Sequence, residues 1–373
     1  MPGRRPWSHP SGAAAGTGAG TVAAVATLVL SDLHLGAIGG RDVLRQPVAL
    51  EPLLAAVRRA DRLVLLGDVV ELLEGRPAEA MAEAAPVLGA IGDAAGRNTE
   101  VLVLPGNHDF AAIRPWLAAR AVRGTAVGLH ARVGRESSPW LAQITRALRP
   151  ARPQVRYPGV WLADGVYATH GHYLDRHLTP ELVRRAVLPR FARVVGAVPD
   201  PATPEDYERA GGPNFAAIAG LLASEAPPDV ADAIDRLAGA ARRAALSALP
   251  RATALLGLSG LAPGSAEALG TQLRRAGLAA MGEVVARLGV DAEHVVFGHI
   301  HRAGPFPADD AEEWVTRTGA RLVNSGCWVR EPFLHDGVDP GHPFAPGRAV
   351  WLDDAGGAPR LASLLGEPPA AAA

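Results

Sequence analysis

The chain has 373 residues, of which 48% are hydrophobic and 20% charged, enough material for the core of one large domain. The formal net charge of -1 predicts no general attraction to nucleic acid or to an acidic membrane surface. The single cysteine, Cys327, excludes an internal disulfide and a cysteine-based metal cluster.

Both ends of the chain differ in composition from the rest. Residues 1–21 mix Arg, Ser, Gly and Ala, and 366–373 are rich in Pro and Ala, so we expect two disordered tails. A signal peptide is not favoured, because the apolar run 22–30 leads directly into polar Ser31 and Asp32. No run of about 18 apolar residues is free of charges and helix breakers, so we expect no membrane-spanning helix. The expected location is the cytoplasm, with membrane association as an alternative.

Short apolar runs alternate with helical segments in the first part of the chain. The expected strands are 22–30, 62–66 and 101–104. Helical spacing is present at 50–59 and 78–95, and Pro86 is expected to break the second helix. This alternation predicts a parallel sheet with helices on its faces.

Polar side chains follow each of these strands. They are Asp32, His34, Asp68, Asn107, His108 and Asp109. Ligands of open α/β sheets collect at the carboxyl ends of the strands, so we expect these side chains to share one edge.

The later elements bring four more imidazoles to strand ends. In chain order we expect helices at 111–122 and 135–149, a hairpin of 154–162 and 166–169, and strands at 294–297, 321–323 and 348–352. The hairpin ends in His170 and His172, and the strand after it leads to His299 and His301.

The alternation stops over 176–290, which is rich in Ala, Leu and Arg and interrupted by Pro-containing breaks. We expect a helical cap inserted into a core of 22–175 and 291–365; the alternative is that these helices complete the core. Some leucines could pack helices or line a groove for an apolar substrate tail, namely Leu221, Leu222, Leu237, Leu255, Leu256 and Leu258.

The donor atoms at the strand ends indicate metal chemistry. Carboxylates and imidazoles without thiolates suit borderline-hard divalent ions. The groups are too many for one tetrahedral ion and suit two octahedral ions that share a carboxylate and bind a phosphoryl group. We predict two divalent metal ions, with Mn preferred and Fe, Zn or Ni as alternatives.

In order along the chain, these motifs resemble those of the calcineurin-like metallophosphoesterases. They are D-x-H at Asp32 and His34, G-D at Gly67 and Asp68, G-N-H-D ending at Asp109, H-G-H at His170, and G-H-x-H ending at His301. The resemblance covers the expected core and excludes the tails and the insertion. It implies an α/β fold with a β-sandwich flanked by helices in αββα layers, together with the helical cap.

The resemblance also implies a role for each motif residue. One ion is held by Asp32, His34 and His301, the other by Asn107, His170 and His299, and Asp68 bridges them. His108 acts on the leaving oxygen as a general acid, and Asp109 orients its imidazole. The reaction implied is in-line attack of metal-bound hydroxide on phosphorus.

Other residues near the motifs are less specific. His172, Arg176 and His177 are candidates for substrate binding, with support of the site or an ordinary helix-start role as alternatives. Glu71 is interpreted as a solvated carboxylate at a helix start rather than as a loop contact. The segment from Asn324 to Gly326 resembles a structural support near the site of such enzymes.

Within the family, three features point to the branch of UDP-2,3-diacylglucosamine diphosphatase. They are S-D-L-H-L-G, G-D-V-V-E-L-L and a helical insertion between the fourth and fifth motifs, which receives acyl chains in that branch. We expect hydrolysis of a phosphate ester or pyrophosphate on a phosphorylated small-molecule or lipid-linked substrate. The alternative is a nucleotide or nucleoside-polyphosphate hydrolase without a lipid groove.

Two other function classes are less favoured. A nuclease would need a basic channel interleaved with aromatic residues, whereas aromatic residues make up 5% and the net charge is -1, so nucleic acid is not an expected partner. A non-catalytic scaffold would have a degraded site, whereas His108 and every ligand are present. Peripheral membrane contact through amphipathic helices of the insertion is compatible with the sequence, and the oligomeric state is not predicted.

Overall fold

The computed structural model describes residues 25–178, 198–211, 266–331, 334–335, 339–353 and 357–366. Nearly all of the expected tails, the first residues of the expected first strand, and the insertion leucines named above lie outside this part of the chain. Within it, no helix is both long enough and apolar enough to cross a membrane.

The strands form one mixed sheet in the order β10-β9-β1-β2-β3-β5-β6-β7-β8, with β4 paired to β5. Their bounds are β1 (Ala26–Leu30), β2 (Arg62–Leu66), β3 (Glu100–Leu104), β4 (His130–Val133), β5 (Gln154–Ala163), β6 (Val166–Thr169), β7 (His294–Phe297), β8 (Arg321–Asn324), β9 (Arg348–Asp353) and β10 (Arg360–Ser363). Strands β1, β2, β3 and β5 are parallel, as are β6, β7 and β8.

Antiparallel pairs complete the sheet, so the expectation of a parallel sheet holds only for its two halves. The hairpin of β5 and β6 joins the halves. Strand β9 runs antiparallel to β1, because β8 ends at the edge where the ligand loops lie and the chain enters β9 from that side. Strands β4 and β10, which the sequence did not predict, extend the sheet by antiparallel pairing with β5 and β9.

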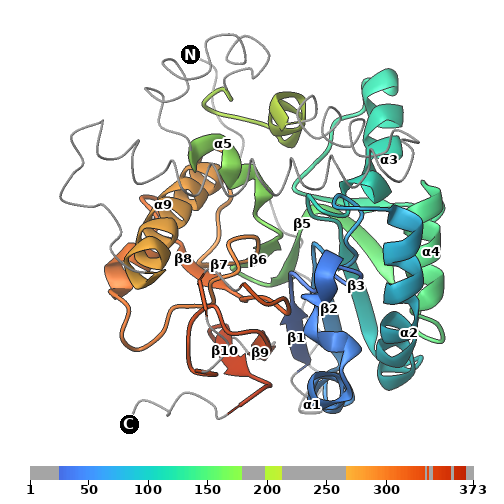
Figure 1. The fold of residues 1–373 in the computed structure, drawn as a ribbon. Helices are drawn as coiled ribbons and strands as arrows, with labels where there is room; N and C mark the ends of the chain where they lie inside the picture. The colour runs from blue at the N-terminus through green and yellow to red at the C-terminus, as the bar shows by residue number, and fades with distance from the viewer. Residues whose placement is uncertain are drawn as a thin grey trace, which may run out of the picture.

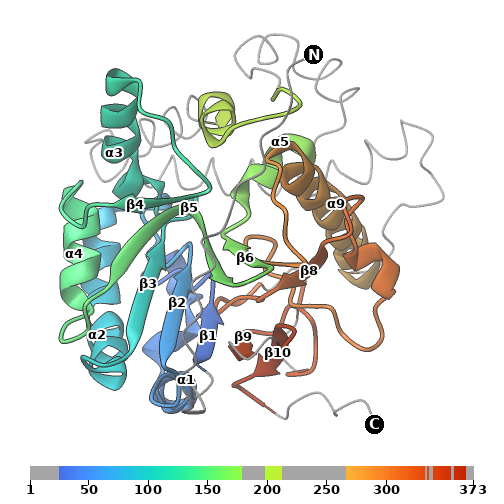
Figure 2. The same ribbon diagram turned by 180° about the vertical axis from the view of Figure 1, so that it is seen from behind.

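Helices flank the sheet on both sides. They are α1 (Pro47–Val57), α2 (Pro77–Ala95), α3 (Phe110–Arg123), α4 (Pro139–Ala147), α5 (Asp175–Leu178) and α9 (Ala266–Arg287). Helices α2 and α4 lie on one side and α9 on the opposite side (Figure 1), and the reverse view agrees (Figure 2). A further helix spans 204–211.

Helix α2 continues through Pro86, contrary to the expected break. Proline removes one backbone N–H and the bond it would make to the carbonyl of Ala82. Both residues are on the exposed face, where that carbonyl is open to solvent. Val87, Leu88 and Ile91 on the opposite face are buried against the core and keep the helix in place.

Three hydrophobic clusters hold these elements together. The largest joins α1 to α4 with β1 to β3, and includes Leu88 and Val101. The second joins α9 to β7 and β8 through residues such as Met281 and Val295. The third consists mainly of strand residues from both halves of the sheet, Leu104 among them. Helix α9, whose residues fall within the expected insertion, packs against β7 and β8 in the second cluster. The division into a core and a cap stays a prediction.

We expect Leu104→Ala to lower the free energy of unfolding by roughly 2–5 kcal/mol, because it opens a cavity in the cluster between the strands. Leu273→Ala is the matched control, since Leu273 is 39% exposed and its loss leaves no cavity. Urea unfolding of both variants measures the difference. Equal midpoints for the two variants would contradict this assignment of the core.

Candidate metal centre

The loops that follow β1, β2, β3, β6 and β7 meet at one edge of the sheet, as the strand-end pattern predicts. They carry the seven predicted ligands, Asp32, His34, Asp68, Asn107, His170, His299 and His301. One group of ligand atoms within 4.8 Å of one another comes from Asp32, His34 and His301, and another from Asp68, His170 and His299. Asn107 joins the second group through Oδ1, which lies 3.0 Å from Nε2 of His170.

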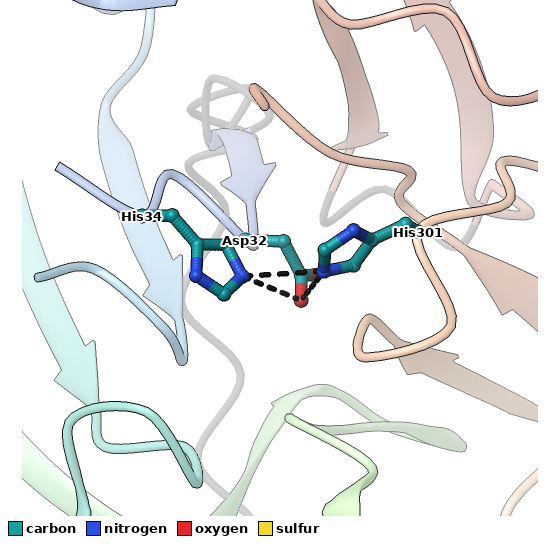
Figure 3. A group of neighbouring side chains, drawn as sticks. All are labelled: Asp32, His34 and His301. Carbon is teal, nitrogen blue, oxygen red and sulfur yellow. Dashed lines mark hydrogen bonds and ion pairs between the residues drawn. The ribbon is translucent and has the colours of Figure 1, made fainter. Parts of the chain in front are cut away.

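The first group faces inward from two loops that are far apart in the chain (Figure 3). Nε2 of His301 lies 3.3 Å from Oδ1 of Asp32 and 3.2 Å from Nε2 of His34. Nε2 of His34 lies 4.0 Å from the same carboxylate oxygen. Three donor atoms of the types that bind Mn, Fe or Zn therefore surround one point.

Asp68 lies between the two groups. Its Oδ2 is 3.2 Å from Nε2 of His170 and 3.6 Å from Nε2 of His34. Its other oxygen, Oδ1, accepts a hydrogen bond of 2.8 Å from the backbone N–H of His108. The carboxylate is thus oriented so that one oxygen is directed toward both groups.

One ring nitrogen of each ligand imidazole meets a hydrogen-bond acceptor. The pairs are His34 Nδ1 with Glu71 at 2.9 Å, His301 Nδ1 with Glu331 at 2.9 Å, His170 Nδ1 with the Leu66 carbonyl at 3.0 Å, and His299 Nε2 with Asp175 at 2.7 Å. Carboxylate and carbonyl oxygens only accept, so these nitrogens carry the proton. In a neutral ring the opposite nitrogen then has a lone pair, which is the arrangement of metal-ligating histidines.

This proton assignment leaves acceptors facing acceptors at the centre of the site. Nε2 of His34 meets Nε2 of His301 and a carboxylate oxygen of Asp32. Nε2 of His170 meets oxygens of Asp68 and Asn107. Lone pairs at such distances repel unless a cation or a proton lies between them. The donor set therefore fits a divalent ion in each group.

Without ions, protons take the place of the cations. Burial lowers the pKa of His170, but the charge of Asp68 and hydrogen bonds outweigh burial and raise it to about 9. Burial likewise lowers the pKa of His301, and its hydrogen bonds to Asp32 and Glu331 raise it well above the ordinary value. Burial raises the pKa of Asp32, but His301 and His170 lower it to about 2.

Among the described residues, the non-glycine residues with positive φ are all predicted ligands. They are Asp32 at 54°, His34 at 44°, Asp68 at 50°, His299 at 69° and His301 at 57°. Each such conformation costs on the order of 1–3 kcal/mol and persists only where surrounding contacts impose it. Strain concentrated in this way is typical of functional sites.

Two motif glycines are required by close approach to ligand side chains. A Cβ on Gly106 would lie 2.3 Å from Oδ1 of Asp68, and a Cβ on Gly298 would lie 2.4 Å from Oδ2 of Asp32. The carboxylates occupy the space that any other residue would fill. These glycines of the G-N-H-D and G-H-x-H motifs therefore support the ligands sterically.

His108 is oriented by Glu71 rather than by Asp109, the partner expected from the sequence. Nδ1 of His108 donates to Glu71 at 2.7 Å. The prediction that Glu71 is solvated was wrong, because this residue is fully buried. Asp109 instead accepts from the backbone N–H groups of Val69 and Gly106. Its carboxylate thus fixes the loops that carry Asp68 and His108.

Burial lowers the pKa of His108, but the charge of Asp68 and the hydrogen bond to Glu71 outweigh it and raise the pKa to about 9. The side chain is 21% exposed. A protonated, accessible imidazole at neutral pH is suited to donate a proton to a leaving group. His108 also lies within 4.8 Å of ligand atoms of His34 and Asp68, which places it beside a member of each group.

The three residues predicted to bind substrate all have protein partners. His172 is buried, with Nε2 3.3 Å from the Tyr157 hydroxyl. Arg176 donates to the Ala210 carbonyl, and Nε2 of His177 lies 2.9 Å from the Tyr207 hydroxyl. Their contact with a substrate stays a prediction.

Two carboxylates in contact with the predicted ligands were missed in the sequence. Glu331 lies in a loop after β8 that has no motif of its own. Asp175 lies shortly after the H-G-H motif, and this position in the sequence could have identified it as a candidate for contact with a ligand. The support expected from Asn324 is present, since its Nδ2 donates to the Gly298 carbonyl at 2.6 Å.

Comparison with known proteins adds no family assignment: no family model matches the chain, and no curated protein matches it.

We expect Mn to stabilise the protein more strongly as the pH rises. The raised pKa of His170 means that its proton stabilises the metal-free fold fully below pH 6.5, and that this contribution is lost as the pH rises toward about 9. A bound ion replaces the proton, so binding releases protons and tightens with pH. Calorimetric titration with Mn at about pH 6 and about pH 8, in two buffers of different ionisation enthalpy, measures both effects. Affinity that does not change with pH, without proton release, would contradict the assignment.

Proposed function

We propose that this chain is a calcineurin-like metallophosphoesterase, a hydrolase that cleaves a phosphate ester or pyrophosphate with the help of two divalent ions. The observation that carries the proposal is the pair of acceptor clusters joined by Oδ2 of Asp68, 3.6 Å from Nε2 of His34 and 3.2 Å from Nε2 of His170. Pairs of divalent ions held close together occur in phosphatases and nucleases, where they clamp the attacking and leaving oxygens.

The core supports the finer fold expected from the resemblance. Helix-to-strand clusters lie on two sides, and a cluster composed mainly of strand residues from both halves of the sheet lies apart from them. Such a division favours αββα layers, in which two sheet halves pack face to face between helices. We therefore include this layered β-sandwich in the proposal.

The two predicted ion positions differ in their ligands. Asp32 and Asp68 bring carboxylates to the first, whereas the second has the neutral oxygen of Asn107 and shares Asp68. Two bound divalent ions neutralise charge on a phosphoryl group and lower the pKa of a water beside it. Mn is the preferred expectation from the mixed imidazole and carboxylate donors.

The chain itself supplies the proton for the leaving oxygen. Glu71 holds Nδ1 of His108, so the opposite nitrogen, Nε2, is the atom that can donate to a substrate. The raised pKa keeps the imidazole charged at neutral pH, and its positive charge attracts the phosphate. Glu71 also accepts from Nδ1 of His34, so one carboxylate orients both a predicted ion ligand and the general acid His108.

We expect metal-free protein reloaded with Mn to hydrolyse bis-p-nitrophenyl phosphate or p-nitrophenyl phosphate, and Asp68→Ala to abolish turnover because it removes the shared ligand. His108→Ala should slow an alkyl phosphate ester by roughly 100- to 10,000-fold and the p-nitrophenyl esters much less, since p-nitrophenolate leaves without a proton. Steady-state kinetics on both kinds of ester measure this difference.

The matched control is His130→Ala, because His130 is exposed on β4 and belongs to neither group of predicted ligands. It should leave both activities unchanged. The proposal fails if wild-type protein with two bound ions turns over no phosphate ester. Equal losses on both kinds of ester in His108→Ala would remove the general-acid role.

We expect Glu71→Gln to move the alkaline limb of the kcat–pH profile to lower pH, because Glu71 adds to the charge of Asp68 in raising the pKa of His108 and its own contribution is lost. The same change should weaken Mn binding by roughly 10–100-fold, since His34 loses its partner. Profiles at saturating Mn separate the two effects. Glu79→Gln is the control, because the Glu79 side chain is 69% exposed. An unchanged profile in Glu71→Gln would contradict the assigned role.

A further inference from the structure

The four ligand imidazoles differ in how firmly their outer partners are held. Three partners lie in the interior or in a strand, namely Glu71, Glu331 and the Leu66 carbonyl. The fourth is Asp175, which accepts from Nε2 of His299 at 2.7 Å and whose side chain is 42% exposed. The position of His299 thus depends on a residue at the surface.

Asp175 is the first residue of α5 (Asp175–Leu178). Helix α9 and the 204–211 helix both pack against the segment that carries Asp175. Arg176 donates to the Ala210 carbonyl, His177 lies 2.9 Å from the Tyr207 hydroxyl, and the Tyr207 ring stacks on Tyr173 at 4.7 Å and 9°.

The 204–211 helix is itself anchored on several elements. Its start is capped by Thr203 and Asp206, which bond to each other through backbone and side chain. Glu208 accepts from the hydroxyls of Tyr157 and Tyr173, and so ties the helix to β5 and to η3 (His172–Leu174). The Ala202 N–H donates to the last turn of α9 at 2.9 Å. The helix therefore connects the core to the residue that supports His299.

The second ion position depends on this support more than the first does. The first has Asp32 as a carboxylate of its own, whereas the second shares Asp68 and otherwise has the neutral groups of Asn107, His170 and His299. A carboxylate behind an imidazole fixes its orientation and raises its basicity as a ligand. Loss of Asp175 would therefore affect the ion position whose ligands carry the least negative charge.

We infer that Asp175 is a positioning residue for the second ion, and that docking of the 204–211 helix on α5 sets how tightly this ion is held. The inference rests on the proposed dinuclear site and deepens it. The second ion is the exchangeable one, and its occupancy follows the docking of a segment from the region between the fourth and fifth motifs.

The test is titration of metal-free protein with Mn alone, with calorimetry for affinities and elemental analysis for stoichiometry. Asp175→Asn should weaken the binding of the second ion by roughly 10–100-fold and leave the binding of the first unchanged. Asp175→Glu should restore most of the lost affinity. Asp164→Asn, an exposed change in the β5–β6 turn, is the control and should bind as wild type.

Docking is tested by Tyr207→Ala and, should that variant not fold, by the milder His177→Ala. Like Asp175→Asn, each variant should lower the affinity for the second ion and leave the affinity for the first unchanged. Equal affinities in Asp175→Asn and wild type, or equal weakening of both ions, would overturn the positioning role. Docking variants with wild-type affinities would overturn the coupling. Wild-type protein that binds fewer than two ions would instead overturn the proposed dinuclear site, before any variant is compared.

Discussion

Lone pairs that face one another at the edge of the sheet are the constraint on which the rest of this structure depends. An acceptor beside each ligand imidazole fixes the position of its proton. The other nitrogens of His170 and His301 then meet carboxylate and amide oxygens at 3.0 to 3.3 Å. Such a cluster is stable only around positive charge, supplied by protons or by ions. The fold therefore assembles a site that requires positive charge at its centre.

Backbone strain shows how firmly the fold imposes this arrangement. The ligands with left-handed backbones lie directly after β1, β2 and β7, where parallel pairing still holds the loops. The Asp32 N–H donates to the Gly67 carbonyl and the His34 N–H to the Asp68 carbonyl. The Asp32 carboxylate in turn accepts the His299 N–H at 3.0 Å. The first and last motifs thus stabilise each other's strained turns across 267 positions of sequence.

The sequence predicts those parts of the site that depend on strand ends, and misses those that depend on loops. Asp32, Asp68 and His170 follow strands directly, so sheet geometry alone brings them together. Glu331 contacts His301 from a loop without a periodic pattern. From the sequence alone Glu71 resembles a surface carboxylate, because only its packing against His34 and His108 in the fold removes it from water. The prediction of a helix break at Pro86 was wrong for a similar reason. Burial of one face of α2 outweighed the local tendency of proline to end a helix.

The two halves of the site have different sources of rigidity, and this difference has a chemical consequence. Around the first position, Glu71 and Glu331 are buried and each holds a ligand imidazole directly. Around the second, the support for His299 comes from Asp175, whose side chain is 42% exposed. In the proposed dinuclear site, neutral Asn107 would leave an ion there more electrophilic and better able to polarise a phosphoryl oxygen, while fewer charges would hold it in place. Tight binding and strong polarisation thus make opposite demands on the proposed second position, and Asp175 would act on the first of these demands through its hydrogen bond to His299.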